Sequence, residues 1–251
     1  YLSRLVLNPS SRSVHRELAN CHALHRTIMS GFPNLAAGGD ARSRLGVLYR
    51  VEPEGRQPGI TVLVQSAIKP SWPALPKGYL IEGPGVPVNP DSKPLDPLLH
   101  ALQPGLRARF RLRANPTKRI GRGSPGKRVD LRREEDQLEW LGRKGEQSGF
   151  HLLDVGVKQA RPAQTVLAGA GNEASGAAWA VEDVRTSLDA RVTGWRPDRS
   201  KMTFGAVTFD GLLRITDVDR FREALIQGIG TGKAYGFGLL SIAPASSGGW
   251  R

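Results

Sequence analysis

The first half of the chain contains several apolar runs separated by turns, and one amphipathic segment. The apolar run Leu2–Leu7 predicts a strand. Hydrophobic residues then recur at helical spacing over residues 14–30, after Ser13, a residue type that caps helix N-termini, and predict one helix. Two β-rich runs, 45–51 and 60–68, are joined by a turn that contains Pro and Gly and predict two more strands.

Two shorter segments complete the first half. Residues 72–75 predict a short helical piece and residues 79–81 a last strand, so the predicted order is βαββαβ. Six prolines between Gly83 and Gly105 are typical of a linker or irregular loop. We therefore predict a first domain at 1–83, a linker at 84–105 and a second domain at 106–245.

The second half repeats this order of elements. It contains predicted strands at 106–114, 150–157, 202–209 and 237–242, and predicted helices at Glu134–Gln147 and Val218–Gln227. Residues 161–190 are rich in Ala and Gly, show little periodicity and predict an insertion or loop. The predicted fold class is α+β, with two tandem ferredoxin-like (RRM-like) βαββαβ domains. The two halves share no residue-by-residue repeat, so this prediction rests on element order alone.

The composition narrows the function classes. The chain has 251 residues, of which 39% are hydrophobic, and this length suffices for one large or two ordinary domains. A formal net charge of +13 favours a polyanionic partner, with RNA, DNA and anionic membrane surfaces all open. No apolar run approaches the roughly 18 residues of a membrane helix. A single cysteine, Cys21, excludes an internal disulfide and fits a reducing cytoplasm.

The positive charge is concentrated in residues 105–133, which hold eleven basic residues and one acid. In the strand predicted at 106–114, arginines alternate with apolar residues and share one face. A basic hairpin predicted after Asn115 and Pro116 could enter a groove or clamp phosphates. Three acids at 134–136 offer an alternative pairing but cannot neutralise eleven bases. The predicted nucleic-acid contacts here are Arg107, Arg109, Arg111, Arg113, Lys118, Arg119, Arg122, Lys127 and Arg128.

The first predicted helix carries candidate catalytic residues. His22, His25 and Arg26 lie at i, i+3 and i+4, so their side chains converge on one side. Two imidazoles and a guanidinium can cleave RNA without a metal, because they supply a proton acceptor, a proton donor and a cation for the phosphate. A purely structural role is the alternative for helical histidines. No cofactor is expected, and no zinc, because no Cys or carboxylate cluster offers the missing ligands.

A glycine-rich run forms the third signal, with five glycines among the eleven residues that start at Gly228. It is not a Walker loop, because Gln227 and Ala234 stand where that motif needs Gly and Ser or Thr. It leaves a helix and enters a strand, the reverse of a dinucleotide-binding turn. Two explanations of the glycines remain: the backbone approaches a nucleic acid closely, or it approaches a neighbouring element of the protein. The predicted binding residues of this run are Gly230, Gly232 and Lys233.

Together these segments resemble the CRISPR-associated RNA-processing endoribonucleases of the CasE (also called Cse3) type. The matching pieces are Leu-Val-Leu-Asn-Pro at 5–9, His-Arg-Thr at 25–27, Phe-Arg-Leu-Arg-Ala-Asn-Pro at 110–116 and the glycine-rich run at 228–241. The resemblance implies two ferredoxin-like domains, a cytoplasmic location and cleavage of the repeat stem-loop in a CRISPR transcript. It also implies that the enzyme stays bound to its product and assembles with the other Cascade subunits.

Carried over by position, His25 matches the family's catalytic histidine, and the hairpin after Arg113 matches the element that inserts into the RNA stem. The departure is His22, where family members often carry Tyr, and we expect His22 to take over that polar role. An A-form stem hides its base edges, so recognition should depend on shape and phosphates. Further candidates for phosphate contacts are Arg191, Arg196, Arg199 and Lys201.

The expected reaction is attack by the RNA's own 2′-hydroxyl, which leaves a 2′,3′-cyclic phosphate or 3′-phosphate and a 5′-hydroxyl. The sequence does not decide which of His22 and His25 is base and which is acid. One alternative is a non-catalytic subunit that binds an RNA hairpin, and another is a structural subunit whose arginine face docks an acidic protein. Aromatics make up only 6% of the chain, which argues against single-stranded base stacking.

Overall fold

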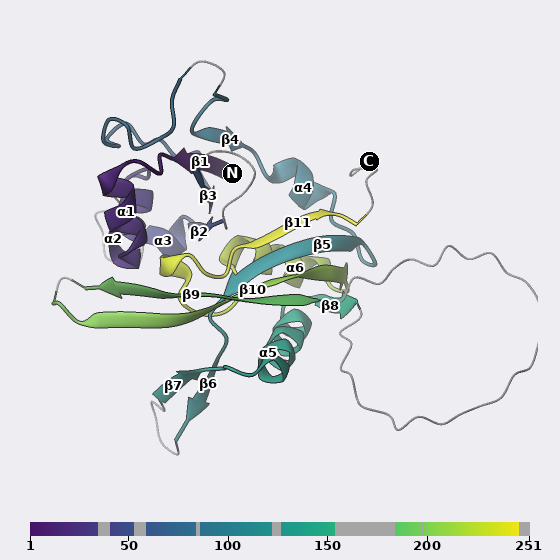
Figure 1. Cartoon of the computed structure of the whole chain (residues 1–251). Coiled ribbons are helices and arrows are strands. Elements are labelled where there is room, and N and C mark those ends of the chain that lie inside the picture. The colour runs from purple at the N-terminus through teal and green to yellow at the C-terminus, as the bar shows by residue number, and fades with distance from the viewer. Residues whose placement is uncertain are drawn as a thin grey trace, which may run out of the picture.

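The computed structural model describes residues 1–34, 41–52, 59–83, 86–121, 127–153, 184–196 and 198–245. Arg122, the end of the strand predicted at 150–157 and most of the insertion predicted at 161–190 lie outside these residues. The described chain forms two antiparallel sheets with helices and a separate two-stranded hairpin (Figure 1). None of its described helices is long and apolar enough to cross a membrane.

The first sheet has the strand order of a ferredoxin-like domain. It consists of β1 (Leu2–Leu7), β2 (Leu48–Val51), β3 (Ile60–Gln65) and β4 (Asp91–Lys93) in the order β2-β3-β1-β4, with every pair antiparallel. The alternation along β1 buries Leu5 and Leu7 on the side where the helices pack. Val62 and Val64 of β3 are fully buried beside them, and these residues form the first core.

The helix predicted at 14–30 is two helices, so that prediction is wrong in its middle. They are α1 (Arg12–Leu18) and α2 (Cys21–Met29), followed by the short α3 (Ala41–Arg44). The side-chain oxygen of Asn20 accepts a hydrogen bond from the His22 N–H at 3.2 Å and caps α2. Asn favours such a cap over a helix interior, because its side chain competes for backbone groups. The cap of α1 is Ser11, and the predicted cap Ser13 lies inside the helix.

The predicted linker at 84–105 is instead structured in its second part. It supplies β4 at the edge of the first sheet and the helix α4 (Asp96–His100). Ser92 of β4 shares a 2.8 Å hydroxyl hydrogen bond with Ser3 of β1. Prolines flank β4 on both sides. Proline has no backbone N–H to donate, and an edge strand tolerates this because one of its sides has no partner strand.

Two other predictions of the first half are wrong. Residues 72–75 form turns rather than a helix, because Pro73 and Pro76 remove backbone donors and disfavour helical geometry in the residues before them. Residues 79–81 make only an isolated bridge between Leu80 and Leu7, and β4 takes the place of the predicted last strand.

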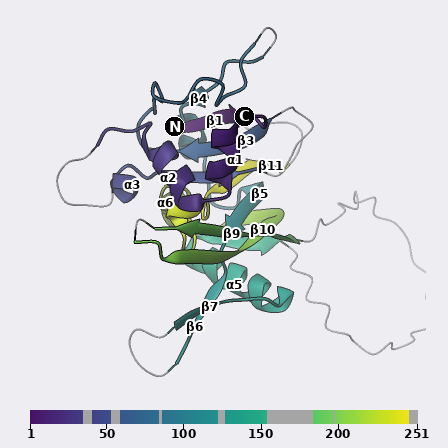
Figure 2. The same cartoon turned by 60° about the vertical axis from the view of Figure 1, so that its left-hand side comes forward.

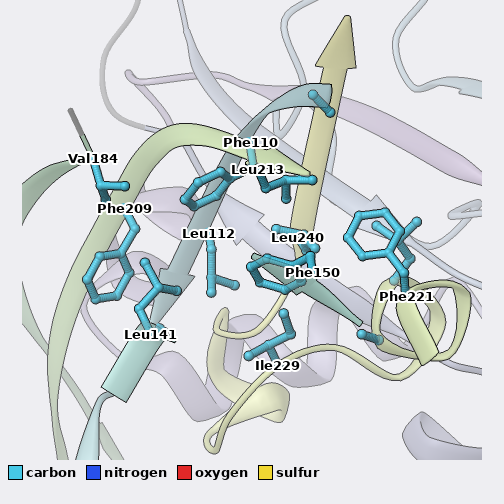
Figure 3. Close-up of a cluster of buried hydrophobic side chains, with 14 of the residues drawn as sticks. Phe110, Leu112, Leu141, Phe150, Val184, Phe209, Leu213, Phe221, Ile229 and Leu240 are labelled. Carbon is cyan, nitrogen blue, oxygen red and sulfur yellow. The ribbon is translucent and has the colours of Figure 1, made fainter. Parts of the chain in front are cut away.

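The second sheet repeats the ferredoxin-like order. Its elements are β5 (Arg107–Ala114), α5 (Glu134–Gln147), β8 (Phe150–Leu153), β10 (Lys201–Ile215), α6 (Val218–Gln227) and β11 (Leu240–Pro244), with strand order β11-β5-β10-β8. Both helices have the predicted bounds. Phe110 and Leu112 of β5, Phe209 of β10 and Phe221 of α6 are buried in one core (Figure 3). The tandem ferredoxin-like fold is confirmed.

Two hairpins extend this second domain. The first, which we call the basic hairpin, consists of β6 (Thr117–Ile120) and β7 (Lys127–Asp130) and projects from the end of the molecule opposite the first sheet (Figures 1 and 2). The second is formed by β9 (Arg185–Trp195) and β10, which is longer than predicted. The insertion prediction is therefore wrong for its last residues, because they begin β9.

A buried arginine joins the two domains. The Arg50 side chain on β2 is 3% exposed and donates to the carbonyl oxygens of Arg111 at 3.1 Å and Leu239 at 3.0 Å. Its charge is balanced by Glu52, which also binds Arg111 of the second domain. Removing these charges from water is tolerable only because each has partners, so the network fixes the domains against each other.

Candidate active site and nucleic-acid interface

Helix α2 presents the candidate catalytic histidines beside the second domain. His22 and His25 are partly buried one turn apart, and Arg26 is exposed. The Asn20 side chain that caps α2 also accepts a hydrogen bond from the backbone N–H of Trp195 in β9, at 3.2 Å. A Cβ atom at Gly194 would lie 2.6 Å from the Cys21 sulfur, so only glycine allows this close contact.

An aromatic cluster from the second domain contacts His25 through one ring, that of Tyr235. The glycine-rich run contains a short 3₁₀ turn, η1 (Lys233–Tyr235), and the Tyr235 ring lies edge-on to the His25 imidazole with ring centroids 6.1 Å apart. Phe204 packs on Tyr235 at 5.2 Å and on Phe237 at 5.9 Å. Sequence reasoning missed Tyr235 and Phe204, because nothing in the local pattern indicates which aromatic residue faces α2.

A cleft of about 240 Å³ lies next to this cluster, between α2, β2 and β9. Tyr235 forms part of its wall, and Arg113 and Arg191 are the cations that line it. Cys21 also lines the cleft, but burial raises the pKa of its thiol to about 11. The thiol is therefore neutral near pH 7 and offers no nucleophile.

Half of the arginine face on β5 points to acids within the protein. Arg111 is paired with Asp210 at 2.7 Å and with Glu52 at 3.2 Å, and hydrogen bonding to Asp210 raises the pKa of Arg111. Arg113 is paired with Asp189 at 2.7 Å. Such a face needs an outside anion or acidic partners, and two of its arginines have acidic partners that are distant in sequence. Arg107 and Arg109, towards the other end of the strand, are exposed.

A groove of about 350 Å³ brings the basic hairpin and the glycine-rich run together. The predicted residues Lys118, Arg119, Arg128 and Lys233 line it, and Lys144 of α5 is a further cation among the described residues of its wall. Lys144 was missed because it stands in an ordinary amphipathic helix. Burial lowers the pKa of Lys233, and the nearby cations Arg42 and Lys144 lower it further. An anion in this groove would relieve that repulsion.

The glycines predicted to bind nucleic acid have a packing role in the fold. Gly230 has a φ of 86°, and a Cβ atom there would lie 3.0 Å from the Trp140 ring. Gly232 has a φ of 73°, and its Cβ would lie 2.8 Å from the Phe237 ring. The alternative of close approach to a neighbouring element therefore accounts for both glycines, while Lys233 carries the charge of this run.

The remaining predicted cations lie on the two hairpins. Arg196, Arg199 and Lys201 are exposed at the turn between β9 and β10, next to the Trp195 backbone that contacts α2. The Lys201 ammonium lies 5.9 Å from the centroid of the Trp195 ring. The remaining cation of the described basic hairpin, Lys127, is exposed on β7. Among the described residues, no three His, Cys, Asp or Glu side chains come together as a metal site.

These features define a class of protein, a tandem ferredoxin-like protein with a basic groove and a histidine-bearing helix near it. Residues 1–244 match the family model described as CRISPR associated protein. The chain is 38% identical to the CRISPR-associated endoribonuclease Cse3 of Thermus thermophilus, over 97% of this chain and 100% of that protein. It is 30% identical to the CRISPR system Cascade subunit CasE of Escherichia coli, over 97% and 99% of the two chains.

Comparison of the fold with solved structures indicates the same family. The structure of Thermus thermophilus Cse3 bound to an RNA representing a pre-cleavage complex is similar, with a TM-score of 0.68 and 32% identity. The similarity covers 97% of this chain and 98% of that one. This chain belongs to the family of CRISPR-associated proteins.

Proposed function

We propose that this chain is a metal-independent endoribonuclease that cleaves the CRISPR repeat stem-loop in a precursor transcript and stays bound to the product as a Cascade subunit. The relatives named as endoribonuclease and as Cascade subunit support it. One observation on this chain carries it. Tyr235, which contacts His25, and Lys233, which lines the basic groove, belong to one three-residue turn. The candidate catalytic imidazole is thus tied to the surface suited to phosphates.

In this proposal the RNA stem lies along the basic groove. Lys118, Arg119 and Arg128 of the hairpin and Lys233 of the glycine-rich run bind its phosphates. Arg111 and Arg113 hold the protein together instead, because their charges are already balanced by acids. The exposed cations at the β9–β10 turn extend the basic surface towards α2.

The reaction transfers a phosphoryl group within the RNA, from the 5′-oxygen to the 2′-oxygen. One group takes the proton of the 2′-hydroxyl as the 2′-oxygen attacks the adjacent phosphorus. The bond from phosphorus to the 5′-oxygen breaks, and a second group gives a proton to the leaving 5′-oxygen. His25 acts as one of the two proton-transfer groups, and His22 supplies the second in place of the family's usual tyrosine. Arg26, exposed one residue after His25, is the candidate cation for the scissile phosphate. Each positioned proton transfer contributes about 10²–10⁴ in rate.

The proposed domain division follows the packing. The first domain extends through β4, because that strand completes the first sheet. The second begins at α4, where Leu99 packs on the second core and its carbonyl oxygen accepts from Arg222. We further propose a cytoplasmic location, because the substrate would be a cellular transcript and a single cysteine suits a reducing compartment.

The experiment that tests the function uses a labelled CRISPR repeat stem-loop incubated with the purified chain in EDTA. We expect a single cut, with a 5′-hydroxyl on the downstream product and a cyclic phosphate or 3′-phosphate on the other. The second candidate function is a subunit that only binds the stem-loop, favoured by the extent of the basic groove. Tight binding without any product would establish that alternative.

A further inference from the structure

The base of the basic hairpin is attached to the second sheet by one carboxylate. Asp130 ends β7 and pairs with Thr117 at the start of β6. Its Oδ1 accepts a hydrogen bond from the Asn115 side chain at 2.9 Å. Its Oδ2 accepts from the backbone N–H of Gly205 at 3.1 Å and from the Arg191 guanidinium at 3.1 Å. Asp130 therefore ties the hairpin to β9, to β10 and to the residue after β5.

Asn115 extends this cluster to the glycine-rich run. It is 5% exposed, and its side-chain NH₂ donates both to Asp130 and to the carbonyl oxygen of Gly205, the latter at 2.8 Å. Its side-chain oxygen accepts from the Thr231 hydroxyl at 3.4 Å. The same cluster thus contacts both walls of the basic groove, because Thr117 and Thr231 line it.

Gly205 makes the attachment possible. The register between β9 and β10 shifts between Phe204 and Ala206, which is a β-bulge. A bulge leaves backbone groups unpaired within the sheet. At Gly205 the N–H goes to Asp130 and the carbonyl oxygen to Asn115. A Cβ atom at this position would lie 3.0 Å from the Asp130 Oδ2, so glycine leaves the room that the carboxylate occupies.

The hairpin needs such an attachment. Within the described part of the chain, β6 and β7 pair only with each other and have four residues each. An isolated two-stranded hairpin is marginally stable in water. Asp130 is also the single acid among the eleven bases of residues 105–133. A carboxylate at that place repels a polyanion, so RNA binding by charge alone would be better without it.

We propose that Asp130 and Asn115 are positioning residues, which set the angle at which the basic hairpin meets the glycine-rich run and thereby fit the groove to an RNA duplex. This inference rests on the proposed function and deepens it. It makes the groove selective for the shape of a stem, whereas cations on a freely moving hairpin would bind any RNA. Neither residue needs to touch the RNA for this effect.

The test compares Asp130→Ala with Glu134→Ala, which removes an exposed carboxylate four residues away at the start of α5. Binding is measured to a repeat stem-loop with a 2′-deoxy nucleotide at the cut site, and to an unstructured RNA of equal length. We expect Asp130→Ala to bind the stem-loop about tenfold more weakly and the unstructured RNA as well as wild type or better. A tenfold loss of affinity corresponds to about 1.4 kcal/mol. Glu134→Ala should bind both RNAs as wild type does or more tightly.

A conservative variant and a double-mutant cycle separate an effect on hairpin position from an effect on folding. Asp130→Asn keeps one acceptor oxygen, so its affinity for the stem-loop should lie between those of wild type and Asp130→Ala. Arg119→Ala should weaken stem-loop binding less in the Asp130→Ala background than in wild type, because Arg119 acts through the placement of the hairpin. Thermal unfolding checks each variant, and if Asp130→Ala does not fold, Asp130→Asn decides by the same comparison.

The outcomes are distinct. Stem-loop binding by folded Asp130→Ala or Asp130→Asn that equals or exceeds that of wild type overturns the inference and leaves the proposed function intact. An equal loss for both RNAs also overturns it, since positioning predicts a loss that depends on shape. A wild-type chain that does not prefer the stem-loop overturns the proposed function, and the inference with it.

Discussion

The ring of Tyr235 meets the imidazole of His25 edge-on, with planes inclined at 69° and centroids 6.1 Å apart. The pair joins the two domains, because His25 lies on α2 and Tyr235 on the turn of the glycine-rich run. Such an aromatic pair contributes about 0.5–1.5 kcal/mol beyond the burial of its area. The second domain thereby helps to set the orientation of the residue that the proposal makes catalytic.

Tyr235→Ala should lower the single-turnover rate constant of stem-loop cleavage by up to about tenfold, since about 1.4 kcal/mol corresponds to a tenfold change. Affinity should change less, because the groove cations remain. Tyr235→Phe keeps the ring and should restore most of the rate. Cleavage with protein in large excess over RNA measures this rate constant separately from binding and product release. A Tyr235→Phe variant as slow as Tyr235→Ala would show that the hydroxyl, and not the ring contact, is what matters.

RNA affinity should begin to fall at a lower pH than it would if Lys233 had the ordinary pKa of a lysine. RNA binds the protonated form, and burial with two nearby cations lowers the pKa of Lys233 in the free protein. Affinity is therefore highest below that lowered pKa and declines as the pH rises through it. Lys233→Arg should remove this decline, because arginine stays protonated.

The measurement is the dissociation constant of the 2′-deoxy stem-loop between pH 7 and 10, for wild type, Lys233→Arg and the control Lys93→Arg. Lys93 is exposed on β4, and this strand lies at the end of the molecule away from the basic hairpin (Figure 2). A decline that persists unchanged in Lys233→Arg would assign the pH dependence to another group.

Removing one cation of the basic hairpin should reduce the salt dependence of RNA binding. Arg119→Ala should lower the slope of log affinity against log salt by about one, because one fewer counterion is released. Titrations of the stem-loop at several salt concentrations give this slope. Lys93→Ala serves as the matched control and should leave it unchanged, and equal effects of the two variants would place the RNA elsewhere.

Arg50 should be a major source of stability. Arg50→Met removes the donor from the backbone carbonyl oxygens of Arg111 and Leu239. Among the described residues it leaves Glu52, 15% exposed, with Arg111 as its ion partner. Breaking a buried ion pair in this way costs about 3–5 kcal/mol. Urea unfolding followed by circular dichroism measures the free energy. Arg143→Met, which loses only an exposed pair with Glu139, should cost less than about 1 kcal/mol, and a similar small loss for Arg50→Met would contradict the account.

The regular part of the fold is predictable from sequence because its signals are local. The bounds of α5 and α6 follow from helical periodicity, and β1 follows from one apolar run. The predictions fail where a single side chain or a distant pairing decides. Asn20 breaks one periodic segment into two helices, and β4 forms from three polar residues that are a strand only because β1 pairs with them.

The candidate site shows the same division. Charge clustering finds Lys118, Arg119 and Arg128, because a local excess of one sign is visible in the sequence. The same signal does not show which arginines of β5 have acidic partners, since the acids that pair with Arg111 and Arg113 come from other elements. Contacts such as that of Tyr235 with His25 join residues far apart in the chain, and no local pattern contains them.

The catalytic role of His25 is tested by comparing His25→Ala with wild type on the CRISPR repeat stem-loop in EDTA, with binding and cleavage measured on the same samples. His15→Ala is the matched control, because His15 is an exposed histidine on α1 bonded to the carbonyl oxygen of Pro9. All three proteins should bind the stem-loop with similar affinity. Wild type and His15→Ala should cut it once, and His25→Ala should not cut it. Cleavage by His25→Ala at the wild-type rate would contradict that role.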